Sequence, residues 1–445
     1  MKASAPTVPM NLWCGRPACT SPDSRSLSRA RGNRTFPLLA LGLGSLLLAQ
    51  AGDAPTEPTG VLTDTEAPVA RRVRLDDKQL EAAREGRLGW QFKRNGAPAG
   101  SIVPVQWEAE TNSAEGTVVC LMPAHAVDVA PPDWRRMESA FPSWVRAVLD
   151  AASGQVDFFE QDRPVLRYNY RTVEPGEVLS QVAEGNRRYA RPRSNYLHPL
   201  YGPDGAILTR DWSLDHPHHR GIYWAWPEVD FGQERGDLHA LQRVFARPTG
   251  RVHLESGPVF AQVKAENLWL WEDREPIVRE EAILRAYRAT PRGRVVDLVF
   301  RFHALADGVT IARRETSHYG GLNLRLATPQ EQRITVHTDA PASAPRRAWS
   351  DLSGVFAGTE SSGLTVLQHR DNPEYPGDWV QYPELSWVQP TFPTAGTRYP
   401  LSRERPLVLR FRLWVHPGGA IDPAWAAQLW DAWHAPSSAL ILPHE

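Results

Sequence analysis

Residues 295–304 read VVDLVFRFHA, and the order of apolar and polar residues in this segment points to the fold class. Its apolar residues Val296, Leu298, Phe300 and Phe302 alternate with the polar residues Asp297, Arg301 and His303. This is the pattern of a β-strand with one buried and one solvent-facing side. Similar segments recur along the chain. The clearest of these predicted strands are Val165–Tyr170, Val259–Trp271, Ile277–Tyr287, Leu322–Leu326, Ile334–Thr338, Leu364–His369 and Leu407–His416.

These strands follow one another from about Val156 without intervening helices, and Gly, Pro, Asp and Asn separate them. In Tyr201–Thr209 (YGPDGAILT) a Pro-Asp-Gly turn predicts a hairpin. Many long antiparallel strands predict two stacked sheets. The predicted fold class is therefore mainly β, with a large antiparallel β-sandwich over residues 155–420.

The residues that precede the sandwich show helical as well as strand-like patterns. Leu75–Glu85 and Pro142–Ser153 combine helix-forming residues with a following glycine, so each predicts a helix. Strand-like pieces such as Thr117–Leu121 lie between them. We expect a small mixed α/β region over residues 70–154.

The sequence after the sandwich predicts one closing helix. Asp422 is a good N-cap, and Pro423 suits the first helical position. Trp425 and Leu429 follow at helical spacing, so we expect a C-terminal helix and tail over residues 421–445.

The N-terminus has the features of an export signal. Four arginines precede the apolar run Phe36–Ala49, which ends in the small-residue pattern Ala49-Gln50-Ala51. We expect a signal peptide at residues 1–51, a Pro/Thr/Glu-rich linker at 52–69, and a periplasmic or extracellular protein. No later segment has the apolar length of a membrane span, so we expect no membrane association after cleavage.

Composition excludes several function classes. The chain has 50 Lys and Arg against 51 Asp and Glu, so it has no basic surplus to hold a nucleic acid, and we expect no such partner. It has no Gly-rich phosphate loop and no Gly-x-Ser-x-Gly elbow, which argues against kinases, nucleotide-dependent dehydrogenases and α/β-hydrolases. The 17 tryptophans favour a carbohydrate or glycoside partner, because indole faces stack on sugars.

The densest polar cluster is DHPHHRG at residues 215–221. Histidine both donates and accepts protons near neutral pH. Because Pro217 favours an extended residue before it, we expect His216 and His218 on one side of a strand-like segment and His219 on the other. Asp215 would fix the tautomer of a neighbouring ring. The catalytic candidates are therefore His216, His218, His219 and Asp215.

Two other interpretations of this cluster stay open. It could be a hydrogen-bonded structural corner of the sandwich. It could also bind a divalent metal through His216, His218 and one distant ligand, although no paired carboxylate or cysteine signature accompanies it. No other cofactor is expected.

Arg220 within the cluster and several side chains outside it complete the expected site. Some lie close to the cluster in sequence, and others lie in polar-aromatic loops. The predicted substrate-binding residues are His198, Arg220, Trp224, Trp226, His318, His369 and Trp379.

YLHPLY at residues 196–201, the cluster at 215–221, GLNLR at 321–325 and LWVHPG at 413–418 resemble motifs of one family, the methane oxygenase PmoA-like family. The resemblance covers about residues 155–420. It implies a β-supersandwich similar to galactose mutarotase, a fold of many carbohydrate-active enzymes, rather than methane oxidation, which needs a membrane-spanning protein. It also implies a site at His198, Asp215, His216, His218, His219 and Arg220.

Together these features predict an exported carbohydrate-active enzyme. We expect a hydrolase or lyase, with epimerisation also open, that acts on oligosaccharides or modified glycosides by histidine acid/base chemistry. The absence of an obvious carboxylate pair makes elimination as plausible as ordinary hydrolysis. The alternatives are a non-catalytic glycan-binding module and a metal-dependent enzyme that uses the histidine cluster.

Overall fold

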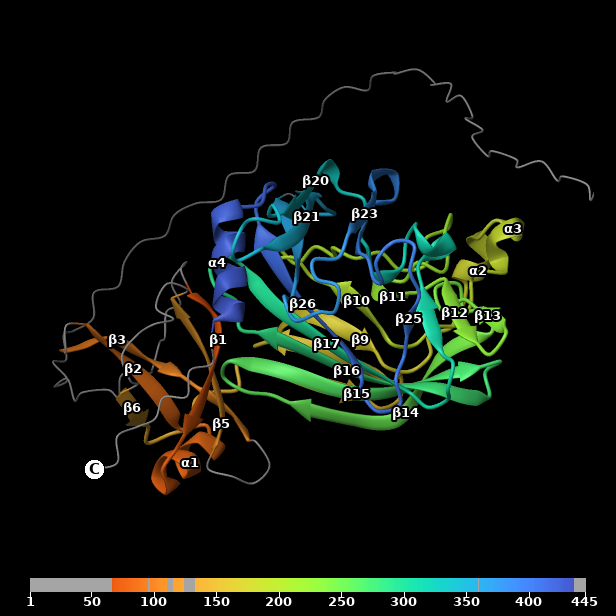
Figure 1. Cartoon of the computed structure of the whole chain (residues 1–445). Coiled ribbons are helices and arrows are strands. Elements are labelled where there is room, and N and C mark those ends of the chain that lie inside the picture. Colours follow the sequence, from red (N-terminus) through yellow and green to blue (C-terminus); the bar gives the residue numbers. More distant parts are fainter. Residues whose placement is uncertain (1–65, 95–96, 110–114, 124–132, 359, 436–445) are drawn as a thin grey trace, which may run out of the picture. The chain divides into compact units, whose positions relative to one another are not determined.

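The computed structural model describes residues 66–94, 97–109, 115–123, 133–358 and 360–435. The expected signal peptide lies outside these residues, as does most of the expected linker. The described chain is mainly β, as the sequence predicted, and its main feature is a pair of eight-stranded antiparallel sheets (Figure 1).

The first sheet collects strands from a long stretch of the chain. They are β7 (Val145–Asp150), β8 (Gln155–Glu160), β9 (Arg163–Asn169), β10 (Tyr196–Leu200), β11 (Ile222–Ala225), β19 (Gly321–Arg325), β23 (Trp379–Tyr382) and β24 (Trp387–Pro390). They lie in the order β23-β24-β19-β11-β10-β9-β8-β7, and every neighbouring pair is antiparallel. This order places β11, which follows the histidine motif, in the middle of the sheet.

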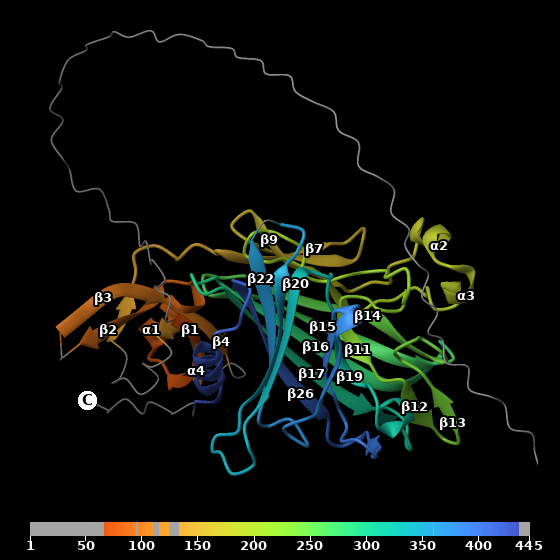
Figure 2. The same ribbon diagram turned by 90° about the horizontal axis from the view of Figure 1, so that it is seen from above.

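The second sheet contains the longest strands (Figure 2). They are β14 (Val244–Glu255), β15 (Phe260–Trp271), β16 (Glu275–Tyr287), β17 (Arg294–Ala304), β20 (Gln330–Thr338), β21 (Ala348–Val355), β22 (Ser361–Gln368) and β26 (Leu407–Pro417). Their order is β14-β15-β16-β17-β26-β22-β21-β20. The alternation predicted for β17 is confirmed, because Val296, Leu298, Phe300 and Phe302 are all buried.

Apolar side chains from the two sheets pack into one core. Tyr168 and Trp224 come from the first sheet, and Phe300, Phe302 and Phe411 come from the second. The Trp224 ring meets the Phe300 and Phe302 rings edge-on, at centroid distances of 4.8 and 5.1 Å. Burial of large apolar side chains at this interface is the main stabilising contribution, and it forms the predicted sandwich.

Smaller elements gather at one end of the sandwich (Figures 1 and 2). The short helices are α2 (Val178–Gln181) and α3 (Glu184–Arg187), with 3₁₀ turns at Arg314–Thr316 and Pro383–Leu385. A four-stranded sheet has the order β13-β12-β18-β25 and consists of β12 (Glu228–Phe231), β13 (Glu234–Gly236), β18 (Thr310–Ala312) and β25 (Tyr399–Pro400). These elements supply most of the loops around the histidine motif.

The region before the sandwich is mixed α/β, as expected. Two three-stranded sheets, ordered β1-β5-β4 and β3-β2-β6, accompany one helix. The elements are β1 (Glu66–Arg74), α1 (Asp77–Arg84), β2 (Leu88–Arg94), β3 (Ala97–Pro104), β4 (Gln106–Ala109), β5 (Glu115–Pro123) and β6 (Asp133–Arg136). The helix predicted at 75–85 is confirmed, and Asp76 and Gln79 form its capping box. The last residues of the expected linker belong to β1.

The helix predicted at Pro142–Ser153 is wrong, because this segment forms β7 at the edge of the first sheet. Val145 and Ala147 are buried on one side of the strand, whereas Val148 and Leu149 are exposed. The apolar residues therefore follow the period of a strand, and pairing with β8 outweighs a weak helix propensity. The sandwich begins with β7, before the expected boundary at residue 155.

The C-terminal helix is confirmed as α4 (Pro423–His434), with the Asp422 carboxylate accepting the backbone N–H groups of Ala424 and Trp425. Trp425 and Trp430 pack with Trp414 of the second sheet and with apolar side chains of β5. Among the helices of the described residues, none has the length and apolar character needed to cross a membrane.

Candidate functional site

The histidine motif forms a turn just before β11. The backbone N–H of His219 donates to the carbonyl of His216 at 2.9 Å, with Pro217 at the second position of the turn, where its fixed φ fits. The expectation of a strand-like segment with His219 on the opposite side is therefore wrong. The turn gathers all three rings, and the His219 centroid lies 4.9 Å from that of His216 and 4.6 Å from that of His218.

Two neighbouring residues fix this turn against the first sheet. Gly221 has a φ of +63°, and a Cβ there would collide with the carbonyl oxygen of Leu197 on β10. Arg220 is 0% exposed, pairs with Asp211 and donates to the hydroxyl of Tyr196. Arg220 therefore anchors the motif within the protein, and the structure does not offer its guanidinium to a substrate.

A second loop brings a fourth histidine to the motif. The loop after β13 carries His239, whose ring centroid lies 4.6 Å from that of His218 and 5.3 Å from that of His219. The loop is held firmly, since Arg193 donates to the carbonyls of Leu238 and His239 at 2.9 and 2.5 Å. Sequence reasoning missed His239, because a single histidine remote from the motif carries no local signal.

Three of these imidazoles converge. One ring nitrogen from each of His218, His219 and His239 lies within 4.8 Å of those of the other two. Burial lowers the pKa of His218 to about 3 and holds the pKa values of His219 and His239 well below the usual range. The three rings are therefore neutral at pH 7.

A polar cavity of about 490 Å³ opens beside the histidines. Its lining comes from the motif turn, the loop after β13, the loop after the 3₁₀ turn at 314–316, and the segment at and after α3. The residues that matter here are Asn186, Tyr189, Asp215, His216, His218, Asp237, His239, Arg314 and Tyr319. The structure thus brings Asp215, His216 and His218 together on one cavity. The buried His219 is not part of the lining but contacts the rings of His216 and His218.

Asp215 and His216 form a hydrogen-bonded pair on the cavity wall. The Oδ2 atom of Asp215 lies 3.0 Å from Nδ1 of His216, and this hydrogen bond holds the pKa of Asp215 well below its usual range. The guanidinium of Arg325, 3.6 Å away, also favours the ionised carboxylate. An ionised Asp215 keeps the proton on Nδ1, so Nε2 is the nitrogen that accepts a proton.

Arg314 and Tyr319 form another part of the wall. Arg314 donates to the Asp237 carboxylate at 2.7 Å and to the Tyr319 hydroxyl at 3.2 Å. Burial raises the pKa of Asp237, while the ion pair with Arg314 opposes this shift. The pair fixes both the loop of His239 and the loop of Tyr319.

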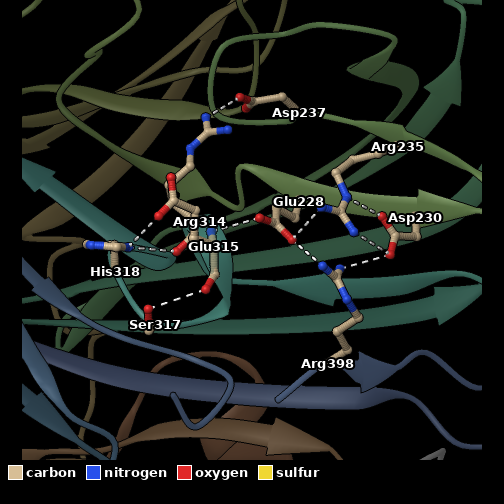
Figure 3. A network of polar contacts seen from close by, with 9 residues as sticks. All are labelled: Glu228, Asp230, Arg235, Asp237, Arg314, Glu315, Ser317, His318 and Arg398. Carbon is tan, nitrogen blue, oxygen red and sulfur yellow. Dashed lines mark hydrogen bonds and ion pairs between the residues drawn. The ribbon is translucent and has the colours of Figure 1, made fainter. Parts of the chain in front are cut away.

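A charged network contacts Glu315, the residue that follows Arg314 (Figure 3). Glu228 of β12 accepts the backbone N–H of Glu315 at 2.7 Å and pairs with Arg235 at 3.1 Å and with Arg398. Asp230 pairs with the same two arginines at 2.7 and 2.8 Å. The alternation of acids and arginines keeps the network compact and fixes the segment that carries Arg314.

The structure does not bring Trp224 and Trp226 to the cavity. Their exposed fractions are 3% and 0%, and their rings stack on each other at 4.6 Å inside the sandwich core. Because strand side chains alternate, Trp224 faces the core while its neighbour Tyr223 faces the histidines. A substrate cannot reach either indole in this structure.

The remaining predicted residues lie apart from the cavity lining of the described chain. His198 contacts the Thr209 hydroxyl at 2.9 Å, and the exposed His318 lies beside Arg314. His369 packs against the α4 residues Trp433 and His434, and Trp379 donates to Thr338 on β20. Of these residues, only His318 adjoins the cavity, through its neighbour Tyr319.

Residues 155–431 match the DUF6807 family, a family of unknown function. The chain belongs to this family. The DUF6807 match begins at β8 and ends within α4, so it covers nearly the whole sandwich and the histidine motif. It includes the range of the expected resemblance, but the comparisons give no support to the name PmoA-like. A search of curated proteins finds no match.

Proposed function

We propose that the polar cavity is the active site of an exported carbohydrate-active enzyme, a hydrolase or lyase of oligosaccharides or modified glycosides. The observation that carries the proposal is the Asp215–His216 pair on the cavity wall. A histidine oriented by a carboxylate is a common arrangement for proton transfer in enzymes.

His216 acts as the general base in this proposal. In hydrolysis, Nε2 takes a proton from water as the water oxygen attacks the anomeric carbon and the bond from that carbon to the glycosidic oxygen breaks. The departing oxygen takes a proton from solvent, and the imidazolium later returns its proton to solvent. In elimination, Nε2 takes a proton from the carbon next to a carbonyl, a C=C bond forms to the adjacent carbon, and the C–O bond of that carbon breaks. The departing oxygen takes a proton from solvent. In both cases the negative charge of Asp215 stabilises the imidazolium that forms.

The rest of the lining suits a hydroxyl-rich ligand. Arg314, Tyr319 and Asn186 carry donors for hydroxyl or carboxylate oxygens. Tyr189, 5.3 Å from the His218 ring, and Tyr319, 5.4 Å from the Trp387 ring, supply aromatic groups of the kind that stack on sugars. These residues replace Trp224 and Trp226 as the aromatic part of the proposed site.

Product analysis tests the proposal. The protein is incubated with plant and algal oligosaccharides and oxidised glycosides, and products are separated by chromatography and identified by mass spectrometry. We expect the wild type to form a product. The rate of its formation should be about 10²–10⁴-fold lower in His216→Gln, which is the usual contribution of a general base.

The matched control is His253→Gln, since His253 is exposed on β14. Unchanged turnover in His216→Gln would overturn the assignment of the base. Glycan binding by the wild type without any product would favour a non-catalytic binding module instead.

A further inference from the structure

We infer that His218, His219 and His239 form a binding site for one divalent first-row transition-metal ion, with Zn²⁺ as its simplest probe. The three come from two separate loops, and their ring nitrogens lie within 4.8 Å of one another. Imidazole is a favoured ligand of Zn²⁺, whereas Mg²⁺ and Ca²⁺ prefer oxygen. The inference goes beyond the proposed function, because ion binding does not require any reaction.

Unsatisfied ring nitrogens point to a ligand that the protein itself does not provide. Within the described residues, the buried Nδ1 atoms of His218 and His219 have no hydrogen-bond partner. Buried polar atoms are almost always paired, so two such atoms in one cluster need an explanation. A metal ion would accept their lone pairs and remove the cost of burying them.

The third proposed ligand, His239, has a hydrogen-bond partner for the ring nitrogen that would not bind the ion. The hydroxyl of Tyr223 lies 3.1 Å from Nδ1 of His239, which leaves Nε2 as the nitrogen for the ion. Metal-binding histidines commonly donate their other ring N–H in this way, and the contact fixes the ring. Arg193 lies 4.5 Å over the Tyr223 ring and also holds the His239 carbonyl, so this arm of the site is rigid.

The charges around the cluster permit a cation. Arg314 is paired with Asp237 at 2.7 Å, and Arg325 lies 3.6 Å from Asp215. Arg193 is the third nearby cation and stacks on Tyr223. Two of these three arginines are thus paired with carboxylates beside the cluster.

The geometry suits a site with three protein ligands. Zn–N bonds of about 2.0–2.1 Å in a tetrahedron separate ligand nitrogens by about 3.4 Å, so modest ring rotations would close the cluster around an ion. His218 and His239 line the cavity, so the fourth position would face it. That position would take water or a sugar hydroxyl or carboxylate oxygen.

Calorimetric titration of chelator-treated protein with Zn²⁺ tests the inference. The full chain is used without a polyhistidine tag. We expect one ion per chain with a Kd in the micromolar range or below, and no comparable binding of Mg²⁺. His239→Ala should weaken binding at least 100-fold, and Tyr223→Phe about 10-fold. His253→Ala, on the exposed face of β14, should leave it unchanged.

Absence of Zn²⁺ binding to the folded wild type would overturn the inference, and so would an unchanged Kd in His239→Ala. Thermal unfolding without metal checks that each variant is folded. If His239→Ala is unfolded, His218→Ala decides, because His218 is only partly buried. Zn²⁺ binding without any glycan product would overturn the proposed function alone, whereas product formation by protein that binds no Zn²⁺ would overturn the metal site alone.

Discussion

The Asp215 carboxylate lies 3.0 Å from Nδ1 of His216, and both side chains stand on the wall of the polar cavity. Asp215→Asn removes the charge that holds the Nδ1 tautomer and stabilises the imidazolium. We expect kcat to fall about 10–100-fold with little change in KM, as steady-state kinetics would show. Asp307→Asn is the control at an exposed carboxylate. Equal kcat values for Asp215→Asn and Asp307→Asn would contradict the role of the pair.

Tyr319 contributes a hydroxyl to the wall and is held by Arg314 at 3.2 Å. Tyr319→Phe keeps the ring and removes only this hydroxyl. We expect KM to rise about 2–10-fold with kcat nearly unchanged, which is the usual cost of one lost hydrogen bond to a bound ligand. A fall in kcat alone would instead place Tyr319 in the chemical step.

Trp226 is predicted to act through the core and not through sugar binding. Its indole N–H donates to the carbonyl of Phe392 at 2.8 Å, and its ring is 0% exposed. Trp226→Phe should lower the free energy of unfolding by about 2–3 kcal/mol, from lost packing and one buried carbonyl left unpaired. Urea denaturation measures this loss. If Trp226→Phe bound glycans more weakly but unfolded with the same free energy as the wild type, the assignment of Trp226 to the core would be contradicted.

Glu280 is predicted to make stability depend on pH. Its carboxylate accepts hydrogen bonds from Asn195 at 2.8 Å and Trp269 at 2.7 Å inside the sandwich, and burial raises its pKa to about 7 from 4.5. Between these two pH values the folded protein keeps a proton that the unfolded chain releases. Stability therefore falls as pH rises from about 4.5 to about 7, and the loss reaches about 3 kcal/mol at most.

Glu280→Gln removes this titration while keeping the shape of the side chain. The free energy of unfolding of the variant, relative to the wild type, should therefore increase from pH 5 to pH 8. Urea denaturation at several pH values checks this. Parallel curves for the two proteins would show that Glu280 does not titrate in this range.

The fold was largely predictable, because its signals are local. Alternation along 295–304 follows from one buried face, and the Pro-Asp-Gly hairpin is confirmed by the bridge between Tyr201 and Ile207. The wrong helix prediction at β7 arose because the segment has few apolar residues, and their spacing is compatible with both a helix and a strand. Pairing with β8 makes the segment a strand, and this pairing depends on residues that lie outside the segment itself.

The site was predictable only where one motif supplies it. Asp215, His216 and His218 reach the cavity together because a single turn carries them. His239 and Arg314 come from loops that only the tertiary structure brings to the same place. Trp224 was expected at the site because it follows the motif in sequence, and Arg220 because it is part of the motif. Strand alternation directs Trp224 inward, and the ion pair with Asp211 does the same for Arg220.

The central claim is that the cavity beside His216 performs chemistry on carbohydrates. The most direct measurement compares product formation by the wild type and by His216→Gln across the glycan panel. The account predicts a product from the wild type whose rate falls at least 100-fold in the folded variant. Equal rates for the two proteins, or no product from any glycan in the panel, would contradict it.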